Sequence, residues 1–325
     1  MTRAIRMHRT GGPEVLALDD IDLPPPARGE ARVAHTALGV NFLDCYHRSG
    51  LYPLPSLPHG LGSEGVGRVE AVGEGVHGLA VGDRVAYAGG VAPGSYAAAR
   101  NVPAWRLVPA PPGVDDVALA GALLKGLTAE FLVRRVFKVG PGHRVLVHAA
   151  AGGVGGLLCQ WLRHVGATVV GVVSTAAKAD VARASGCHHV VVRAEDDVVA
   201  AVARFTQGRG VDVCYDSVGK DTLRESLRCL RKRGLLVSFG NASGRPEPVA
   251  LAELQAGSWF LTRPTLHDYT STRSELLHAA EVFGKLLAGG VLRPRVHAVL
   301  PLAEAATAHR LLESRATAGA LVLTP

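Results

Sequence analysis

The stretch Val145-Leu-Val-His-Ala-Ala-Ala-Gly-Gly-Val-Gly-Gly-Leu-Leu-Cys-Gln-Trp-Leu-Arg163 decides the fold class of this chain. An apolar run typical of a buried strand ends abruptly in glycines, and a helix-compatible run follows. This order predicts the strand, tight turn and helix of a dinucleotide-binding unit. Gly152 leaves room for a pyrophosphate, Gly155 lets the helix sit close to the strand, and the first-turn N–H groups face the anion. The alternative is a glycine-rich structural turn in an unrelated α/β protein.

Strands and helices alternate from about residue 115 to residue 290. Strands are expected at 144–149, 168–173, 189–192, 211–215 and 234–239, with helices in the intervals, as at 175–184 and 222–230. Such alternation predicts right-handed crossovers and a doubly wound parallel sheet.

The two ends of the chain have a different pattern. Residues 1 to about 120 contain short alternating runs, such as 31–38 and 65–72, divided by Pro- and Gly-rich turns. The tail, 293–325, has a Pro-bounded strand, one helix at about 303–313 and a final strand at 320–323. We expect the tail to rejoin the first domain. The predicted domains are therefore 1–120 plus 293–325, and 121–292.

Composition fits a globular protein of two domains. The chain has 325 residues, of which 48% are hydrophobic and 19% charged, which excludes a disordered protein. Its first residues have no apolar core of a signal peptide, and no apolar span of about 20 residues suggests a membrane helix. The five cysteines are scattered and none stands at C-x-x-C spacing, so we expect a reducing, cytoplasmic location.

Basic residues are in moderate excess. The formal net charge is +7, spread along the chain, and its densest run is Arg228-Cys-Leu-Arg-Lys-Arg233. We interpret this run as the end of a solvated helix, where cations meet the helix dipole favourably. The alternative is a nucleic-acid patch. A basic surface would also attract an anionic cofactor.

The second strand of the nucleotide fold predicts the cofactor. NAD-selective folds usually place Asp or Glu after this strand to bind the adenosine ribose. Here Thr168–Val173 is followed by Ser174 and Lys178, with Arg193 after the third strand. A hydroxyl and two cations would bind a 2′-phosphate that a carboxylate would repel, which favours NADPH. Alternatively, Lys178 and Arg193 are simply solvated cations.

The opening stretch, extended back to Gly142, resembles the signature of the quinone oxidoreductase and zeta-crystallin branch of the medium-chain dehydrogenase/reductase superfamily. The resemblance extends over nearly the whole chain, and further short strings resemble those of NADPH:quinone reductases. They are 11–15, 41–44, 48–53, 61–65, 82–85, 124–128, 215–219, 237–241 and 313–317.

The resemblance implies a GroES-like β-barrel domain made from the N-terminal part and the tail, with an inserted Rossmann domain and an active cleft at their junction. It also implies a cytoplasmic homodimer. The candidate interface is the Rossmann strand near residues 254–261, where one sheet could extend across a two-fold axis.

The resemblance further implies an active site without metal. Alcohol dehydrogenases of the superfamily bind catalytic zinc through a Cys, a His in a Gly-His-Glu string, and a later Cys or acid. The corresponding strings here carry Asn41, then Gly62-Ser63-Glu64, then the neighbourhood of Leu124. Asn and Ser are poor zinc ligands, and the four-cysteine lobe of structural zinc is absent. Quinones and conjugated enones suit such a site, because delocalisation spreads the charge that arrives with a hydride.

The resemblance also assigns roles to residues. The implied cofactor-binding residues are Phe42, Asp44, Lys125, Thr128, Gly152, Gly153, Val154, Ser174, Lys178, Arg193, Ser217, Val218, Phe239, Gly240, Asn241, Ser243, Leu266 and Arg315. Arg193 departs from the tyrosine expected there, and Leu266 and Arg315 have ordinary core and surface interpretations. Asn41, Tyr46 and Tyr52 are the substrate-side, catalytic candidates, because they can donate to quinone oxygens and stack on a flat acceptor. Alternatively, the tyrosines only brace a loop of the barrel.

Two other functions remain open. The same site would permit NADPH-dependent reduction of α,β-unsaturated carbonyls, and no residue stands out as the general acid. A nucleotide-regulated RNA-binding or crystallin-like structural role is suggested by the zeta-crystallin relatives. No RRM, KH or OB string is present and aromatics are only 5% of the residues, so nucleic acid is not the favoured partner. The favoured partner is a small-molecule quinone or enone.

Overall fold

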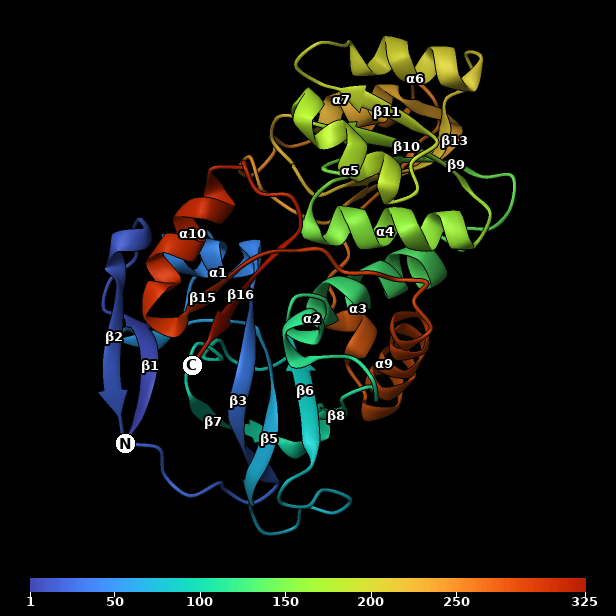
Figure 1. Ribbon diagram of the computed structural model, residues 1–325. Coiled ribbons are helices and arrows are strands. Elements are labelled where there is room, and N and C mark those ends of the chain that lie inside the picture. The colour runs from blue at the N-terminus through green and yellow to red at the C-terminus, as the bar shows by residue number, and fades with distance from the viewer. The chain divides into compact units, whose positions relative to one another are not determined.

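The computed structural model describes all 325 residues, and the chain divides into two compact units (Figure 1). Unit 1 comprises Met1–Leu127, Tyr269–Gly290 and Pro294–Pro325, and unit 2 comprises Thr128–Asp268 and Val291–Arg293. The domain boundaries drawn from the sequence stay a prediction, and they differ from these units mainly at residues 269–290. Helix α9 (Arg273–Ala288) belongs to unit 1, where the Arg273 guanidinium donates to the carbonyls of Trp105 and Leu107.

Unit 1 is built around the long strand β3 (Glu30–Val40), which lies inside a seven-stranded sheet. The order of this sheet is β15-β16-β3-β5-β6-β8, and β7 also pairs with β3. A second sheet has the order β2-β1-β4. The bounds are β1 (Thr2–Met7), β2 (Leu16–Ile21), β4 (His59–Gly60), β5 (Glu64–Val72), β6 (Arg84–Ala88), β7 (Ala99–Pro103), β8 (Val108–Pro109), β15 (Val296–Pro301) and β16 (Ala320–Thr324).

The C-terminal tail belongs to unit 1. Strand β16 pairs antiparallel with β3, with Leu321 opposite Val40 and Leu323 opposite Leu38. Two longer helices of this unit are α1 (Phe42–Ser49) and α10 (Ala305–Glu313). Both contribute apolar residues to one core cluster with these strands. The shorter elements are η1 (Pro13–Val15), η2 (Ala104–Arg106), α2 (Asp116–Ala120), η5 (Asp268–Thr270) and η6 (Leu302–Glu304).

Unit 2 contains a six-stranded sheet in which every pair is parallel, which confirms the α/β prediction. Its order is β11-β10-β9-β12-β13-β14, so β9 lies inside the sheet and β14 at one edge. The strands are β9 (Arg144–Val147), β10 (Thr168–Val173), β11 (His189–Val192), β12 (Val211–Asp216), β13 (Leu230–Ser238) and β14 (Phe260–Thr262). The carboxyl ends of β9 and β12 are neighbours in this sheet, which brings the loops after them together.

Helices fill the intervals between the strands of unit 2 (Figure 1). Apolar residues of α6 and α7 pack with the strands in one core cluster that includes Leu146, Val170 and Cys214. The elements are η3 (Leu132–Val136, a π-helical turn), α4 (Gly153–His164), η4 (Ala176–Lys178), α5 (Ala179–Ala184), α6 (Val198–Thr206), α7 (Leu223–Arg228) and α8 (Leu251–Leu254), and α3 (Leu123–Phe131) runs from unit 1 into unit 2. None of the helices combines the length and the hydrophobicity that a membrane span requires.

The basic run at 228–233 is a local correction to the sequence analysis. Helix α7 ends at Arg228, and β13 already begins at Leu230, so the other cations of the run lie in a strand. Leu230 is buried, Arg231 pairs with Asp212 at 2.5 Å, and Arg233 adopts a φ of 58°. The buried leucine and the ion pair to the neighbouring strand favour pairing with β12 over a longer helix.

Candidate active site

Three polar side chains from distant parts of unit 1 meet in its interior. Lys125 Nζ donates to Asn41 Oδ1 at 2.8 Å and to Glu64 Oε1 at 3.0 Å. Asn41 Nδ2 donates to the same Glu64 oxygen at 2.8 Å. Relative exposure is 6% for Asn41, 0% for Glu64 and 5% for Lys125, so an ion pair and an amide are shielded together from water. We call these three residues the lysine cluster.

The local chain geometry builds this cluster. Asn41 joins β3 to α1, Glu64 begins β5, and Lys125 lies in the first turns of α3. The Leu124 N–H donates to the second carboxylate oxygen of Glu64 at 2.7 Å, so that carboxylate also caps the start of α3. Gly39 makes room for the carboxylate, because a Cβ at this position would lie 2.0 Å from Glu64 Oε1.

Asp44 adjoins the cluster and is fully buried. Its Oδ2 accepts from the Asn41 N–H at 2.8 Å and from Tyr96 Oη at 2.9 Å, and its Oδ1 accepts from Ser63 Oγ at 2.5 Å. Burial raises the pKa of Asp44 to about 6, against the opposing effect of these three donors. Asp44 therefore holds Asn41 in place and is itself poised to titrate just below neutrality.

Behind Asp44, hydrogen bonds continue to the surface of α10. His309 Nε2 lies 3.2 Å from Tyr96 Oη, and His309 Nδ1 lies 3.0 Å from Arg48 Nη1. Arg48 in turn forms a bidentate ion pair with Glu313, with Nη2–Oε1 at 2.6 Å and Nη1–Oε2 at 3.0 Å. Because the Tyr96 hydroxyl donates to Asp44, the Nε2–H of His309 donates to Tyr96, and Nδ1 accepts from Arg48. Burial lowers the pKa of His309 to about 3, aided by Arg48, so the imidazole is neutral.

The two tyrosines predicted on the substrate side lie together, Tyr46 within α1 and Tyr52 shortly after it. The Tyr46 and Tyr52 rings are 5.2 Å apart in an edge-to-face arrangement, and Phe42 lies 6.3 Å from Tyr46. All three side chains are half-buried. The Tyr52 N–H donates to the Tyr46 carbonyl at 3.0 Å. The structure thus brings two predicted aromatic residues together, and their role toward an acceptor stays a prediction.

In unit 2 the glycine turn follows the expected path. Ala149 adopts a φ of 52°, Gly152 is the N-cap of α4, and the Gly152 N–H donates to the Ala149 carbonyl at 2.8 Å. A Cβ on Gly155 would lie 2.1 Å from that same carbonyl oxygen, so only glycine permits this close packing. Gly153 and Val154 form the first turn of α4, whose N–H groups have no partner within the helix. This geometry suits an anion such as a pyrophosphate.

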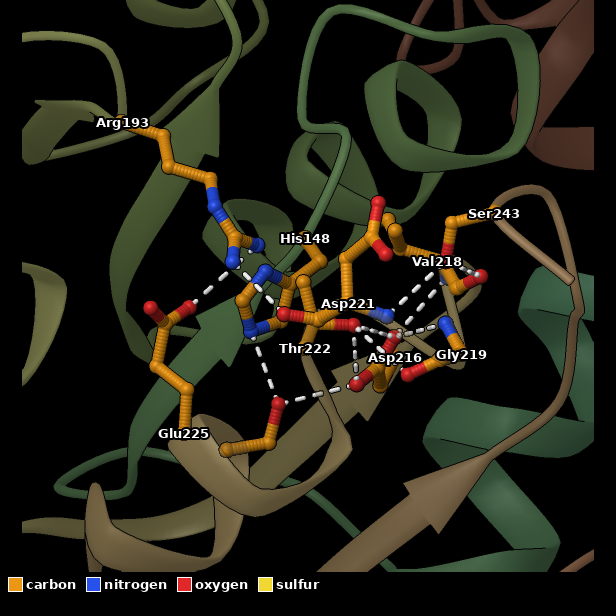
Figure 2. A network of polar contacts seen from close by, with 10 residues as sticks. His148, Arg193, Asp216, Val218, Gly219, Asp221, Thr222, Glu225 and Ser243 are labelled. Atoms are coloured by element: carbon orange, nitrogen blue, oxygen red, sulfur yellow. Dashed lines mark hydrogen bonds and ion pairs between the residues drawn. The ribbon is translucent and has the colours of Figure 1, made fainter. Parts of the chain in front are cut away.

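A buried network around Asp216 joins the neighbouring loops (Figure 2). Asp216 Oδ1 accepts from the N–H groups of Val218 and Gly219, at 2.8 and 3.1 Å. Its Oδ2 accepts from Ser226 Oγ at 2.9 Å, and that hydroxyl lies 2.9 Å from His148 Nε2. Because His148 directly precedes the glycine turn, one carboxylate orders the loop after β12 and, through Ser226, contacts the end of β9.

The loop after β13 packs against the loop after β12. The Ser243 hydroxyl donates to the Val218 carbonyl at 2.8 Å, and the Asp221 N–H donates to that hydroxyl at 3.0 Å. A Cβ on Gly240 would lie 2.4 Å from the Ser217 carbonyl oxygen. The predicted cofactor residues Ser217, Val218, Phe239, Gly240, Asn241 and Ser243 therefore lie on two adjoining loops.

Among the predicted adenosine-side residues, Arg193 is the best defined. Its Nη2 donates to the Asp221 carbonyl at 2.6 Å, and its Nη1 lies 3.5 Å from Glu225 Oε1 (Figure 2). Ser174 is exposed at the end of β10, and Lys178 is half-buried at the end of η4, where burial lowers the pKa of its amine. Arg193 thus follows β11, and its guanidinium is hydrogen-bonded to the loop after β12.

The other predicted residues are more scattered. Thr128 is buried within α3, and Leu266 is half-buried between β14 and η5. Arg315 is exposed after α10 with a φ of 58°. Their cofactor roles stay predictions.

The chain matches known proteins along its full length. A family model described as "Alcohol dehydrogenase GroES-like domain" matches residues 27–112, and one described as "Zinc-binding dehydrogenase" matches residues 153–280. Quinone oxidoreductase 1 of Escherichia coli (strain K12) is 44% identical over 328 residues, covering 100% of both chains. The chain belongs to the quinone oxidoreductase family.

Two further relatives support this membership. A Burkholderia protein named 2-haloacrylate reductase is 44% identical over 334 residues, covering 100% of this chain and 99% of its own. The crystal structure of an Escherichia coli quinone oxidoreductase complexed with NADPH has a TM-score of 0.97 and 45% identity. It covers 99% of this chain and 100% of that one.

Zinc, named in the description of one family model, does not fit the donors of this chain. No group of three His, Cys, Asp or Glu side chains is arranged to hold a metal ion. At the zinc-equivalent strings, Asn41 offers an amide, and Glu64 already binds the Lys125 ammonium and the Leu124 N–H. An ammonium among these oxygens disfavours a metal cation electrostatically, and amide and hydroxyl groups are poor zinc ligands.

Sequence reasoning found several of these residues without their partners. It singled out Lys125 and Asn41 but not their shared carboxylate, Glu64, which entered only as part of a zinc-type string. It also missed Asp216, His148 and Ser226, although the order Tyr215-Asp216-Ser217 at a strand end was a usable signal.

Proposed function

We propose that this protein reduces quinones with NADPH. The observation that carries the proposal is full-length similarity to an Escherichia coli quinone oxidoreductase crystallised with NADPH, at a TM-score of 0.97. NADPH supplies the hydride of the reaction. The protein supplies binding, orientation and polar groups for the charge that develops on the acceptor.

The two units carry different parts of the proposed site. In unit 2, Gly152, Gly153 and Val154 would bind the pyrophosphate, and Ser174, Lys178 and Arg193 the 2′-phosphate. The remaining proposed cofactor residues are Phe42, Asp44, Lys125, Thr128, Ser217, Val218, Phe239, Gly240, Asn241, Ser243, Leu266 and Arg315. In unit 1, Asn41, Tyr46 and Tyr52 would bind the acceptor. Its meeting with the cofactor in a cleft between domains stays a prediction.

The test is NADPH oxidation, followed by absorbance, with 1,4-benzoquinone or 9,10-phenanthrenequinone. We expect turnover that prefers NADPH to NADH and is the same with and without EDTA. Tight NADPH binding without turnover of any quinone would refute quinone reduction and retain the cofactor assignment.

Reduction of α,β-unsaturated carbonyl compounds is the second candidate. It is favoured by the relative named 2-haloacrylate reductase, because a haloacrylate is an α,β-unsaturated carboxylate. Both reactions place negative charge on an oxygen conjugated to the carbon framework. A panel of simple quinones, short enones and 2-alkenals separates the two, and faster turnover of enones would assign the protein to the second class.

We also propose a homodimer formed through the edge of the sheet in unit 2. Strand β14 is an edge strand, and Phe260 on it is 62% exposed, while Leu251 in α8 is 85% exposed. An exposed, partly apolar edge can pair with its own copy across a two-fold axis. Light scattering should give twice the chain mass of 33.9 kDa, and a monomer at that measurement would refute the dimer.

A further inference from the structure

Lys125 is the only buried lysine of the chain, and its environment is unusual for a structural residue. An ammonium has three N–H donors. Two of them go to Asn41 Oδ1 and Glu64 Oε1, and no protein acceptor lies within hydrogen-bonding distance of the third. Burying a charged group is costly unless its donors are used. The third N–H therefore has no protein partner.

Asn41 presents a second donor from the same cluster. Its amide orientation is fixed, because Oδ1 accepts from Lys125 and one N–H of Nδ2 goes to Glu64. The other N–H of Nδ2 has no protein acceptor. Two donors, one of them carrying a full charge, thus remain on adjacent, mutually bonded side chains.

The cluster keeps this arrangement rigid. Glu64 binds Lys125, Asn41 and the Leu124 N–H, while Asp44 holds the Asn41 backbone N–H. Glu64 contacts the Lys125 ammonium directly, and Asp44 is joined to it through Asn41. Fixed donors in a site that excludes water stabilise a developing anion without reorganising during the reaction.

We propose that Lys125 is a catalytic residue of this enzyme, binding the acceptor oxygen together with Asn41 and donating the proton that completes reduction. The proposal rests on the proposed function and refines it, because it moves Lys125 from the proposed cofactor residues to the acceptor. The ammonium supplies the positive charge for which the cluster has no metal.

The proton balance of the step is simple. A quinone gains a hydride from NADPH and one proton, and becomes a hydroquinone. The N–H bond of Lys125 breaks as an O–H bond forms on the acceptor oxygen, and Lys125 becomes a neutral amine. A proton from water restores the ammonium before the next turnover. For a conjugated carbonyl, the same N–H stabilises the enolate oxygen, and the proton reaches the α-carbon from there or from water.

The first test measures anion binding and needs no turnover. In the presence of NADP⁺, 4-nitrophenol is titrated with pH and its ionised form is read by absorbance. We expect the wild-type protein to lower the pKa of bound 4-nitrophenol by about 1 or more, as an opposite charge in contact does. Lys125→Met should abolish this shift, and Lys138→Met, which removes an exposed lysine, should not change it.

Loss of Lys125 leaves Glu64 buried without its counterion and can unfold the protein. The double variant Glu64→Gln plus Lys125→Met removes both charges and should recover most of the thermal stability that Lys125→Met loses. We expect its turnover with 1,4-benzoquinone to stay about a hundredfold or more below wild type, with the dissociation constant of NADPH within about twofold. Stability restored without activity identifies a catalytic role.

Three results would overturn the assignment: a wild-type protein that leaves the pKa of 4-nitrophenol unchanged or does not bind it, a double variant as active as wild type, or NADPH affinity that falls in parallel with the rate. The last result would return Lys125 to the cofactor. Failure of the proposed function looks different. The wild-type protein would then bind 4-nitrophenolate through Lys125 but reduce neither quinones nor enones.

Discussion

The lysine cluster of unit 1 and the nucleotide loops of unit 2 are built by opposite means. In the cluster, three side chains carry the arrangement, and each contact joins a carboxylate, an ammonium or an amide. In the nucleotide loops, backbone groups make most of the close contacts, because glycines let one peptide approach another. Gly155 and Gly240 each face a carbonyl oxygen at a distance that no Cβ could tolerate.

This difference follows from what each part would bind. A pyrophosphate and a ribose are recognised by many N–H groups, and a close backbone supplies them without side-chain freedom. An acceptor oxygen that gains charge during a reaction needs a few strong, fixed donors. We therefore expect unit 2 to be most sensitive to substitutions that add side-chain volume. Unit 1 should be most sensitive to changes in charge.

The sharpest test of the shape-based region is Gly155→Val. The new Cβ would lie 2.1 Å from the Ala149 oxygen and 3.0 Å from the Ala150 Cα, so the glycine turn must move. We expect the free energy of unfolding to fall by about 1–3 kcal/mol and NADPH to bind about a hundredfold more weakly. Chemical denaturation and fluorescence titration measure the two effects.

Gly156→Ala is the matched control, one residue further along α4. Its Cβ would meet Ser185 Oγ at 3.5 Å, which is ordinary contact, and alanine favours the helix by about 1 kcal/mol. NADPH affinity should remain that of the wild type. Equal losses in the two variants would show that α4 tolerates no substitution at all, and that the approach to Ala149 is not the reason.

The same difference explains what could be predicted from the sequence. The glycine turn is contiguous, because every residue that shapes it lies within 145–163, and the parallel sheet around it was predicted strand by strand. The lysine cluster joins residues that are 23, 61 and 84 positions apart. No local pattern encodes such a meeting, so Lys125 and Asn41 were found by resemblance and Glu64 was not recognised as their partner.

The wrong helix end predicted near residues 228–233 also arises from contacts between residues far apart in the sequence. The run at 228–233 is polar and follows a helical pattern, which predicted a longer helix. Tertiary contacts override that preference, since Arg231 pairs with Asp212 on β12 and Leu230 is buried. Cations in a strand are hard to predict because their partners lie on a neighbouring strand.

Charge dominance in unit 1 predicts sensitivity to acid. Burial lowers the pKa of His35 to about 4 and that of His309 to about 3, from 6.5 for an exposed imidazole. As pH falls from 6.5 toward 4, the unfolded chain binds two protons that the folded chain does not, and stability falls. Asp44 opposes one of them, because its pKa, raised from 3.8 to about 6, lets the folded chain take up a proton first.

The net effect should be a fall of about 1–3 kcal/mol in the free energy of unfolding between pH 7 and pH 4.5. Urea denaturation across that range measures it. His309→Gln should flatten the slope whatever its effect on absolute stability, and His77→Gln, at an exposed position, serves as the control. A slope that His309→Gln leaves unchanged would mean that His309 is not the group responsible.

A smaller effect is expected from the buried side-chain network around Asp216 in unit 2. Ser226→Ala would remove the hydroxyl that links Asp216 to His148 and leave the His148 Nε2–H without its acceptor. The free energy of unfolding should fall by about 1–2 kcal/mol, with a smaller loss of NADPH affinity. Ser185→Ala, which removes a bond within one helix, is the control. An unchanged NADPH affinity in both variants would confine the network to stability.

The smallest expected effect concerns Arg193, where the shape-based region contains an accessible charge. If its guanidinium binds the 2′-phosphate, Arg193→Ala should weaken NADPH by about threefold to tenfold and leave NADH unchanged, as befits a solvent-exposed ion pair. Its contacts with the Asp221 carbonyl and Glu225 support a different role, because they order a loop that both cofactors would use. We expect the selective result, since a 2′-phosphate can displace Glu225 at 3.5 Å more easily than it can displace the carbonyl at 2.6 Å. Equal weakening of both cofactors would assign Arg193 to the loop and leave Ser174 and Lys178 to account for any preference for NADPH.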